Sequence, residues 1–155
     1  CHHDPARFST FVSMGIFQGL AGNMQQMDPQ QAQAEYAPWL LPGEQIHNAF
    51  RMLRDGFCIT NLRIITLDHQ GATGKKTRVK SIALNTIVDV TAETAGGGMD
   101  DSEITITFVT TPRLRSHNLA YDSYRFEFPK NFDLPGLYRY LMGVAQENVR
   151  FINQD

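Results

Sequence analysis

The chain has 155 residues, 42% of them hydrophobic, and a formal net charge of -2. This length suffices for one domain with its own core. The charge excludes the global basic field that is typical of nucleic-acid-binding proteins, and no apolar run approaches the length of a membrane span.

Met14-Gly15 resembles a natural start, so we expect residues 1–13 to be a non-native or disordered leader. They lack the basic region and the long apolar stretch of a signal peptide. Cys1 and Cys58 stand far apart, and Cys58 lies in an apolar segment, which predicts a buried thiol rather than a disulfide. We therefore expect a cytoplasmic protein.

Residues 14–40 are expected to form a helical N-terminal segment. Asp28 can accept hydrogen bonds from free backbone N–H groups, and Pro29 suits a first helical turn, so a helix should begin here. It should end near Tyr36, because Pro38 disfavours helical geometry in the residue before it.

Strand signals dominate after residue 45. The clearest is the alternation of Ile104, Ile106 and Phe108 with two threonines, which is typical of a half-buried strand. Asp55-Gly56 predicts a turn. We expect about seven antiparallel strands, near residues 45–53, 57–60, 63–67, 79–82, 88–92, 104–108 and 124–128.

The hydrophobic period changes to that of a helix after Asp133, which is the predicted N-cap, with Pro135 in the first turn. One face of this helix should carry Leu134, Leu137, Tyr138, Leu141, Val144, Ala145, Val149 and Ile152. Arg139, Gln146, Glu147 and Arg150 should face away. A sheet of about seven strands tends to form a two-sheet sandwich or a partly open barrel, and one amphipathic helix can cap its apolar end. The fold class is therefore mainly β with a C-terminal helix.

Gly74-Lys75 resembles part of a phosphate-binding loop. That loop needs G-x-x-x-x-G-K-[ST] followed by a helix. Here His69 stands in place of the first Gly and Lys76 in place of the Ser or Thr, and the next residues favour a strand. Residues 71–76 are therefore predicted to be a hairpin turn.

Two motifs carry a family resemblance. Residues 54–63 follow R-D-x-F-x-x-T-N-x-R, and residues 68–76 follow D-x-Q-G-x-T-G-K-K. With Leu41-Pro42-Gly43-Glu44 before them, they strongly resemble the bacterial pleckstrin-homology-like (PH-like) domain family, from Met14 to about Ile152. Leu62 stands where Lys is usual. The resemblance implies a PH-like domain over residues 41–155 and a cyclic homo-oligomer whose strands pack across protomers, and a hydrophilic surface there is thought to meet other proteins.

We expect a pentamer with an unidentified protein partner. A strand such as Ser102 to Thr110, which carries neither Pro nor Lys, is expected to lie at a sheet edge and to pair with another copy. Arg54-Asp55 and Arg63-Asp68 are candidate ion pairs, and Thr60-Asn61 is expected to make a side-chain-to-backbone turn. The predicted binding or interface residues are Arg54, Asp55, Thr60, Asn61, Arg63, Asp68 and Gln70.

A basic segment gives an alternative function. Lys76, Arg78 and Lys80 should project from one face of a strand, with Val79 on the other and Lys75 just before them. This face can simply be solvated. It can also bind an acidic partner, a phosphorylated ligand or an anionic lipid headgroup, which would place the protein at the periphery of the inner membrane.

Catalysis is not expected. No nucleophile has a neighbouring base in the sequence, although Ser81 or Ser102 could meet a distant His in a hydrolase. His47, His69 and His117 are scattered, so we expect no metal and no cofactor. The leading hypothesis is a non-enzymatic, ring-forming PH-like domain that mediates protein–protein interactions.

Overall fold

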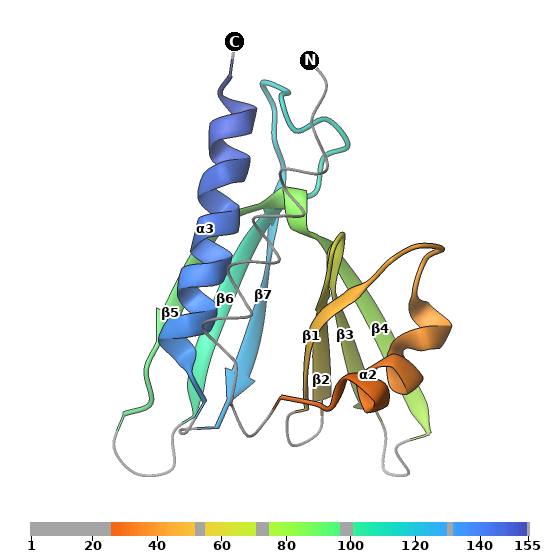
Figure 1. Ribbon diagram of the computed structural model, residues 1–155. Helices are drawn as coiled ribbons and strands as arrows, with labels where there is room; N and C mark the ends of the chain where they lie inside the picture. Colours follow the sequence, from red (N-terminus) through yellow and green to blue (C-terminus); the bar gives the residue numbers. More distant parts are fainter. Residues whose placement is uncertain (1–25, 52–54, 71–74, 97–100, 130–131, 155) are drawn as a thin grey trace. The chain divides into compact units, whose positions relative to one another are not determined.

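Seven strands and a few helical segments lie within the described residues. Figure 1 shows their arrangement. The computed structural model describes residues 26–51, 55–70, 75–96, 101–129 and 132–154. The chain divides into two compact units, and the boundary in the sequence lies between Ser81 and Ile82. In chain order the elements are α2 (Pro29–Tyr36), the 3-10 turn η1 (Ala37–Trp39), β1 (Ile46–Arg51), β2 (Asp55–Thr60), β3 (Arg63–Gln70), β4 (Lys76–Ala83), the 3-10 turn η2 (Leu84–Thr86), β5 (Ile87–Glu93), β6 (Ser102–Val109), β7 (Tyr121–Phe128) and α3 (Leu134–Ile152).

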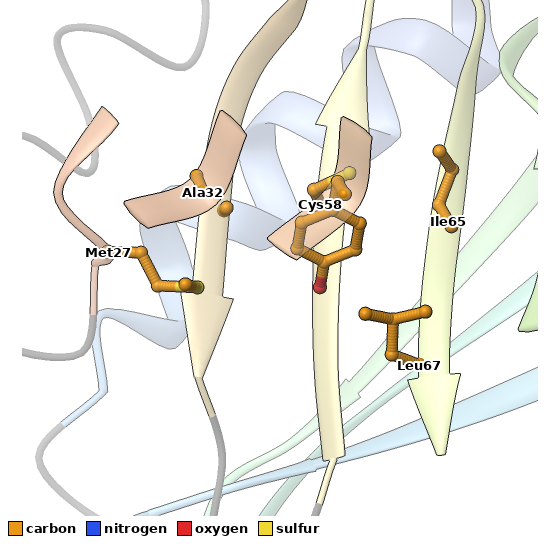
Figure 2. Close-up of a cluster of buried hydrophobic side chains, with 7 residues drawn as sticks. Met27, Ala32, Cys58, Ile65 and Leu67 are labelled. Carbon is orange, nitrogen blue, oxygen red and sulfur yellow. The ribbon is translucent and has the colours of Figure 1, made fainter. Parts of the chain in front are cut away.

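The first unit is a four-stranded sheet in the order β1-β2-β3-β4, covered on one face by α2. Its core gathers apolar side chains from the helix and from the strands that the helix covers (Figure 2). Cys58 lies at its centre as a free, fully buried thiol, as predicted, and burial raises the pKa of this thiol to about 12. The cluster comprises Met27, Ala32, Tyr36, Ala49, Cys58, Ile65 and Leu67, with Leu40, Ile46 and Val79 packed against it.

Helix α2 begins and ends where the sequence predicts. Asp28 is the N-cap, and its carboxylate accepts a hydrogen bond of 3.2 Å from the backbone N–H of Gln30. Tyr36, the last residue of the helix, is fully buried.

A Cβ atom at Gly56 would lie 3.0 Å from the hydroxyl of Tyr36. The prediction of a turn at Asp55-Gly56 is wrong, because both residues belong to β2 and the glycine makes room for Tyr36.

The second unit contains a three-stranded sheet in the order β5-β6-β7. Ile104 and Ile106 of β6 are fully buried, which confirms the predicted alternation. The prediction that Ser102 to Thr110 lies at a sheet edge is wrong, because β6 pairs with β5 on one side and with β7 on the other. In the part of the chain that the structure describes, the outer strands are therefore β1, β4, β5 and β7.

Helix α3 packs mainly against β5, and the two run side by side in Figure 1. Asp133 caps it as predicted, accepting a hydrogen bond of 3.1 Å from the N–H of Gly136. Three residues of the buried face were missed by the sequence pattern, Gly136, Tyr140 and Asn148, whereas Val149 is exposed.

The buried Asn148 stabilises the joint between η2 and β5. Its side-chain amide donates hydrogen bonds of 2.7 and 2.8 Å to the backbone carbonyls of Leu84 and Ile87. Two buried carbonyl groups gain a partner in this way, and the amide nitrogen uses both of its N–H groups.

The predicted fold class is confirmed: the protein is mainly β, with antiparallel strands and an amphipathic C-terminal helix. The strands form two open sheets rather than one closed barrel. The leader at residues 1–13 and the helical start expected from residue 14 lie outside the described residues. In residues 26–40, the described part of the segment 14–40, the helices are α2 and η1.

Candidate functional site

The stretch Leu41-Pro42-Gly43-Glu44 forms a tight turn beside the first sheet. The N–H of Glu44 donates a hydrogen bond of 3.0 Å to the carbonyl of Leu41, and Gly43 has a φ of 79°. A positive φ at the third position, after a proline, is what a type II turn requires, so the residue types account for the turn. The Glu44 carboxylate turns back toward Leu41 and accepts a hydrogen bond of 2.9 Å from its backbone N–H.

Glu44 forms a buried ion pair with Arg63 at the start of β3. The guanidinium binds the carboxylate in the two-pronged mode, with Nε 2.9 Å from Oε2 and Nη2 2.9 Å from Oε1. The Glu44 side chain is fully buried and that of Arg63 is 16% exposed. Arg63 also donates to the Ser81 hydroxyl at 2.6 Å and to the carbonyl of Trp39. One arginine thus joins β3, β4, η1 and the turn.

Thr60 and Asn61 complete this arrangement, which we call the Glu44–Arg63 network. The Thr60 hydroxyl donates to Glu44 Oε2 at 2.6 Å and accepts from the N–H of Arg63 at 3.0 Å. The Asn61 side chain accepts from the N–H of Gln45 at 2.8 Å. The predicted side-chain-to-backbone turn at Thr60-Asn61 is confirmed.

The Glu44–Arg63 network keeps its carboxylate ionised. Burial by itself raises the pKa of Glu44, but the hydrogen bonds from Arg63, from the N–H of Leu41 and from Thr60 outweigh it and hold this pKa at about 2. The pKa of Arg63 is raised in turn by its hydrogen bonds to Glu44. The pair is therefore charged at every physiological pH.

This depressed pKa predicts a loss of stability in acid. The pKa of Glu44 is about 2 in the folded chain, against an ordinary value of 4.5. A lowered carboxyl pKa stabilises the fold above the ordinary value, and the contribution is lost as the pH falls from 4.5 through 2. The loss amounts to about 3 kcal/mol, because each tenfold difference in proton affinity between the folded and unfolded chain corresponds to about 1.4 kcal/mol. Urea denaturation between pH 7 and pH 2 measures it.

The matched variant for this prediction is Glu44→Gln, which keeps the shape and removes the titration. We expect this variant to be less stable at pH 7 but to lose less stability on acidification than the parent. Equal losses in the two proteins would show that other carboxylates account for the acid sensitivity.

The predicted ion pair between Arg63 and Asp68 is wrong. The two residues lie five apart on β3, so their side chains project from opposite faces of the sheet. Asp68 lies opposite Asp55 in the register between β3 and β2. Gln70 ends β3. Arg54 lies outside the described residues, as does its predicted pair with Asp55.

The basic segment forms the outer strand β4 of the first sheet. Lys75, Lys76 and Arg78 are exposed, and Lys80 is half-buried. Val79 packs against the core cluster under α2, which confirms that it projects from the other face. A strand rather than a helix follows Gly74, as the prediction of a hairpin turn requires, while residues 71–74 of that turn lie outside the described residues.

Comparison with known proteins establishes the family. The sequence matches the family described as "Bacterial PH domain" over residues 15–145. The chain belongs to this family. The uncharacterized protein YjqA of Bacillus subtilis (strain 168) is 42% identical over 93 residues, which are 60% of this chain and 74% of YjqA.

Two crystal structures of bacterial PH domain proteins share the fold. A DUF1696 family protein with a pleckstrin-homology domain from Shewanella loihica PV-4 is 28% identical, with a TM-score of 0.60 over 77% of this chain and 95% of its own. A pleckstrin homology domain from Shewanella amazonensis SB2B is 30% identical, with a TM-score of 0.59 over 84% of this chain and 98% of its own. The PH-like fold expected from the motifs is confirmed.

The first family motif of this PH domain and the turn before it converge on one structural feature. Thr60, Asn61 and Arg63 come from the first motif, and all three belong to the Glu44–Arg63 network. Sequence reasoning missed the role of Glu44, although the P-G-E turn is a signal that could have indicated it. The side chains of the network also bind backbone atoms of three exposed apolar residues: the N–H groups of Leu41 and Leu62 and the carbonyl of Trp39.

The serines of the hydrolase alternative lie in unsuitable surroundings. The Ser81 hydroxyl meets the guanidinium of Arg63, which cannot act as a base, and Ser102 is buried. Across the described ranges, no helix of this PH domain is long and apolar enough to cross a membrane.

Proposed function

We propose that this PH domain is a non-enzymatic protein that assembles into a closed homo-oligomeric ring and binds other proteins through it. The observation that carries the proposal is that β5 has no further strand on one side in the described chain. β5 is an outer strand of seven residues, and it contains neither Pro nor Lys. Monomeric proteins commonly use such residues to block edge pairing, because an open edge presents unpaired backbone groups to another chain.

A ring follows when one edge meets a different edge of the next copy. Such a contact is heterologous, and repetition by rotation closes it into a cycle. The two open sheets of this PH domain supply different edges on the same chain, which is what a heterologous contact needs. The predicted interface residues in the first motif remain a proposal, and Arg63 in particular already uses its donors within the protomer.

Light scattering during size-exclusion chromatography tests the ring. We expect a single species whose mass is a multiple of the 17.5 kDa protomer, with five copies as the expected number, and whose mass is constant over micromolar concentrations. A protein that elutes with the mass of one protomer would refute self-assembly and leave a lone binding domain.

The second candidate is binding to an anionic membrane surface. It is favoured by the exposure of Lys75, Lys76 and Arg78 at one end of β4, since each basic residue near an anionic bilayer contributes about 1 kcal/mol. Sedimentation with phosphatidylserine vesicles separates the two candidates. Binding that salt weakens, and that Lys75→Glu with Lys76→Glu abolishes, supports the membrane role. Assembly without vesicle binding supports the ring alone.

A further inference from the structure

We propose that the loop between β6 and β7 binds an acidic segment of a partner protein through Arg113, Arg115 and His117. This inference rests on the proposed binding of other proteins, and it names the surface that binds and the chemistry of the partner. The loop covers residues 110–120, all of them described. Figure 1 shows it projecting beyond the ends of the two strands.

Backbone hydrogen bonds hold the loop at its base and near its tip. The N–H of Thr110 donates to the carbonyl of Ala120 at 2.9 Å, which continues the pairing of β6 with β7. The N–H of Ser116 donates to the carbonyl of Arg113 at 3.4 Å, which closes a four-residue turn. The charged side chains are therefore carried on a backbone with hydrogen bonds of its own.

The loop is a uniformly basic part of an otherwise acidic unit. No Asp or Glu occurs between Glu103 and Asp122, and the basic side chains in that interval are Arg113, Arg115 and His117. In the second unit as a whole, acidic residues outnumber Lys and Arg. All three basic side chains of the loop are exposed. The charge of the loop therefore contrasts with that of the unit around it.

The two arginines of the loop differ from other arginines of the same unit. Arg125 pairs with Glu127 at 3.4 Å, and Arg150 pairs with Glu147 at 3.1 Å. Among the described residues, the guanidinium groups of the two loop arginines form no such ion pair. Each guanidinium has five N–H donors, so both groups can bind a carboxylate of another molecule.

The chemistry of the loop fits a segment rich in Asp and Glu. The planar guanidinium matches a carboxylate in the two-pronged mode, and the imidazole of His117 can donate a further N–H. Tyr121, the first residue of β7, is 56% exposed directly after the loop. Arg and Tyr are enriched at protein–protein interfaces and among the residues that contribute most to binding. A protein segment is therefore the partner that this surface fits best.

Two other anionic partners fit less well. Nucleic acids are bound by domains with a broad basic surface, whereas this chain has a net charge of -2 and Asp122 lies just after the loop. Recognition of an anionic bilayer typically uses clusters of about four to eight Lys and Arg residues. The loop carries only Arg113 and Arg115.

Fluorescence anisotropy with a labelled oligoglutamate peptide tests the inference on the full chain. We expect the parent to bind this peptide and not an oligoglutamine peptide of the same length, and we expect salt to weaken the binding. Arg113→Gln with Arg115→Gln should weaken it about tenfold or more, because hydrogen bonds to charged groups contribute more than those between neutral groups.

Arg125→Gln with Arg150→Gln is the matched control. It makes the same change in net charge in the same unit, at arginine side chains that are 59% and 62% exposed. These arginines already have carboxylate partners, so the control should bind oligoglutamate like the parent. Urea denaturation confirms that both double variants are folded.

The outcomes distinguish the inference from the proposed self-assembly. Absence of oligoglutamate binding by the parent, or an equal loss in the two double variants, overturns the inference. Phosphatidylserine vesicles and single-stranded RNA are tested in parallel. Binding of either that requires Arg113 and Arg115, while oligoglutamate binding does not, also overturns the inference and assigns the loop to that partner.

Light scattering on the same samples reports on the ring independently. A ring that does not bind oligoglutamate overturns the role of the loop and leaves self-assembly standing. A monomer that binds oligoglutamate through Arg113 and Arg115 overturns the ring and supports the role of the loop.

Discussion

Replacing Arg63 with Met will destabilise the protein by about 3–5 kcal/mol, the usual cost of removing one partner from a buried ion pair. Met keeps much of the length of the side chain, so the lost packing is small. The main cost is Glu44, whose side chain is fully buried and is left without its two-pronged partner. The Ser81 hydroxyl and the carbonyl of Trp39 lose a donor at the same time. Urea denaturation followed by circular dichroism measures the change.

Arg51→Met is the matched control for this prediction. Arg51 lies in the same sheet and pairs with Glu35 at 3.1 Å, but its side chain is 66% exposed. An exposed pair contributes about 0–1 kcal/mol, so this variant should remain close to the parent. If the two variants lose the same stability, the buried pair is not a major source of it.

A rescue experiment separates the unpaired charge from other losses. The double variant Arg63→Met with Glu44→Leu removes both charges and should recover a large part of the stability that Arg63→Met loses. Replacing a whole buried ion pair with apolar residues is often neutral or even stabilising. No recovery would instead indicate that the contacts of Arg63 to Ser81 and Trp39 carry the effect.

This result bears on how the ring is tested. Arg63 belongs to the predicted interface, but a charge reversal there places a second carboxylate next to Glu44. Unfolding and loss of assembly would then be confounded.

Local signals in the sequence were sufficient for most elements of the fold. The caps at Asp28 and Asp133 act within a few residues of their own position, so the two helix starts could be predicted. The alternation in β6 is also local, and it correctly gave the buried face. The place of β6 in the middle of its sheet was not predictable, because strand order depends on pairing with distant strands.

The Glu44–Arg63 network was only partly visible in the sequence. Arg63 was singled out by its motif, but the nearest acidic residue in β3, Asp68, was assigned as its partner. The true partner is 19 residues away along the chain, and the turn at Gly43 brings it close. The hydrophobic pattern does not indicate a charged residue that is buried with its partner, because every charged residue is predicted to lie at the surface.

The same reasoning explains the errors on helix α3. Asn148 was left off the buried face because it is polar, yet its partners are backbone carbonyls more than 60 residues away along the chain. Val149 was placed on that face because it is apolar, yet it is exposed. Residue type predicts burial well only where burial depends on hydrophobicity alone.

Leu141→Ala will destabilise the protein by about 2–5 kcal/mol, the usual range for a fully buried leucine. Leu141 is 1% exposed and lies in the middle of the buried face of α3, between Leu137 and Val144. Alanine is the best helix former, so the substitution does not weaken the helix itself, and the loss reports the cavity left in the core. Val149→Ala on the same helix is the control, because that side chain is 38% exposed and should change stability by less than about 0.5 kcal/mol. Urea denaturation of both variants decides the point: a small loss for Leu141→Ala, or an equal loss for the two, would mean that the apolar face of α3 does not carry the packing described for it.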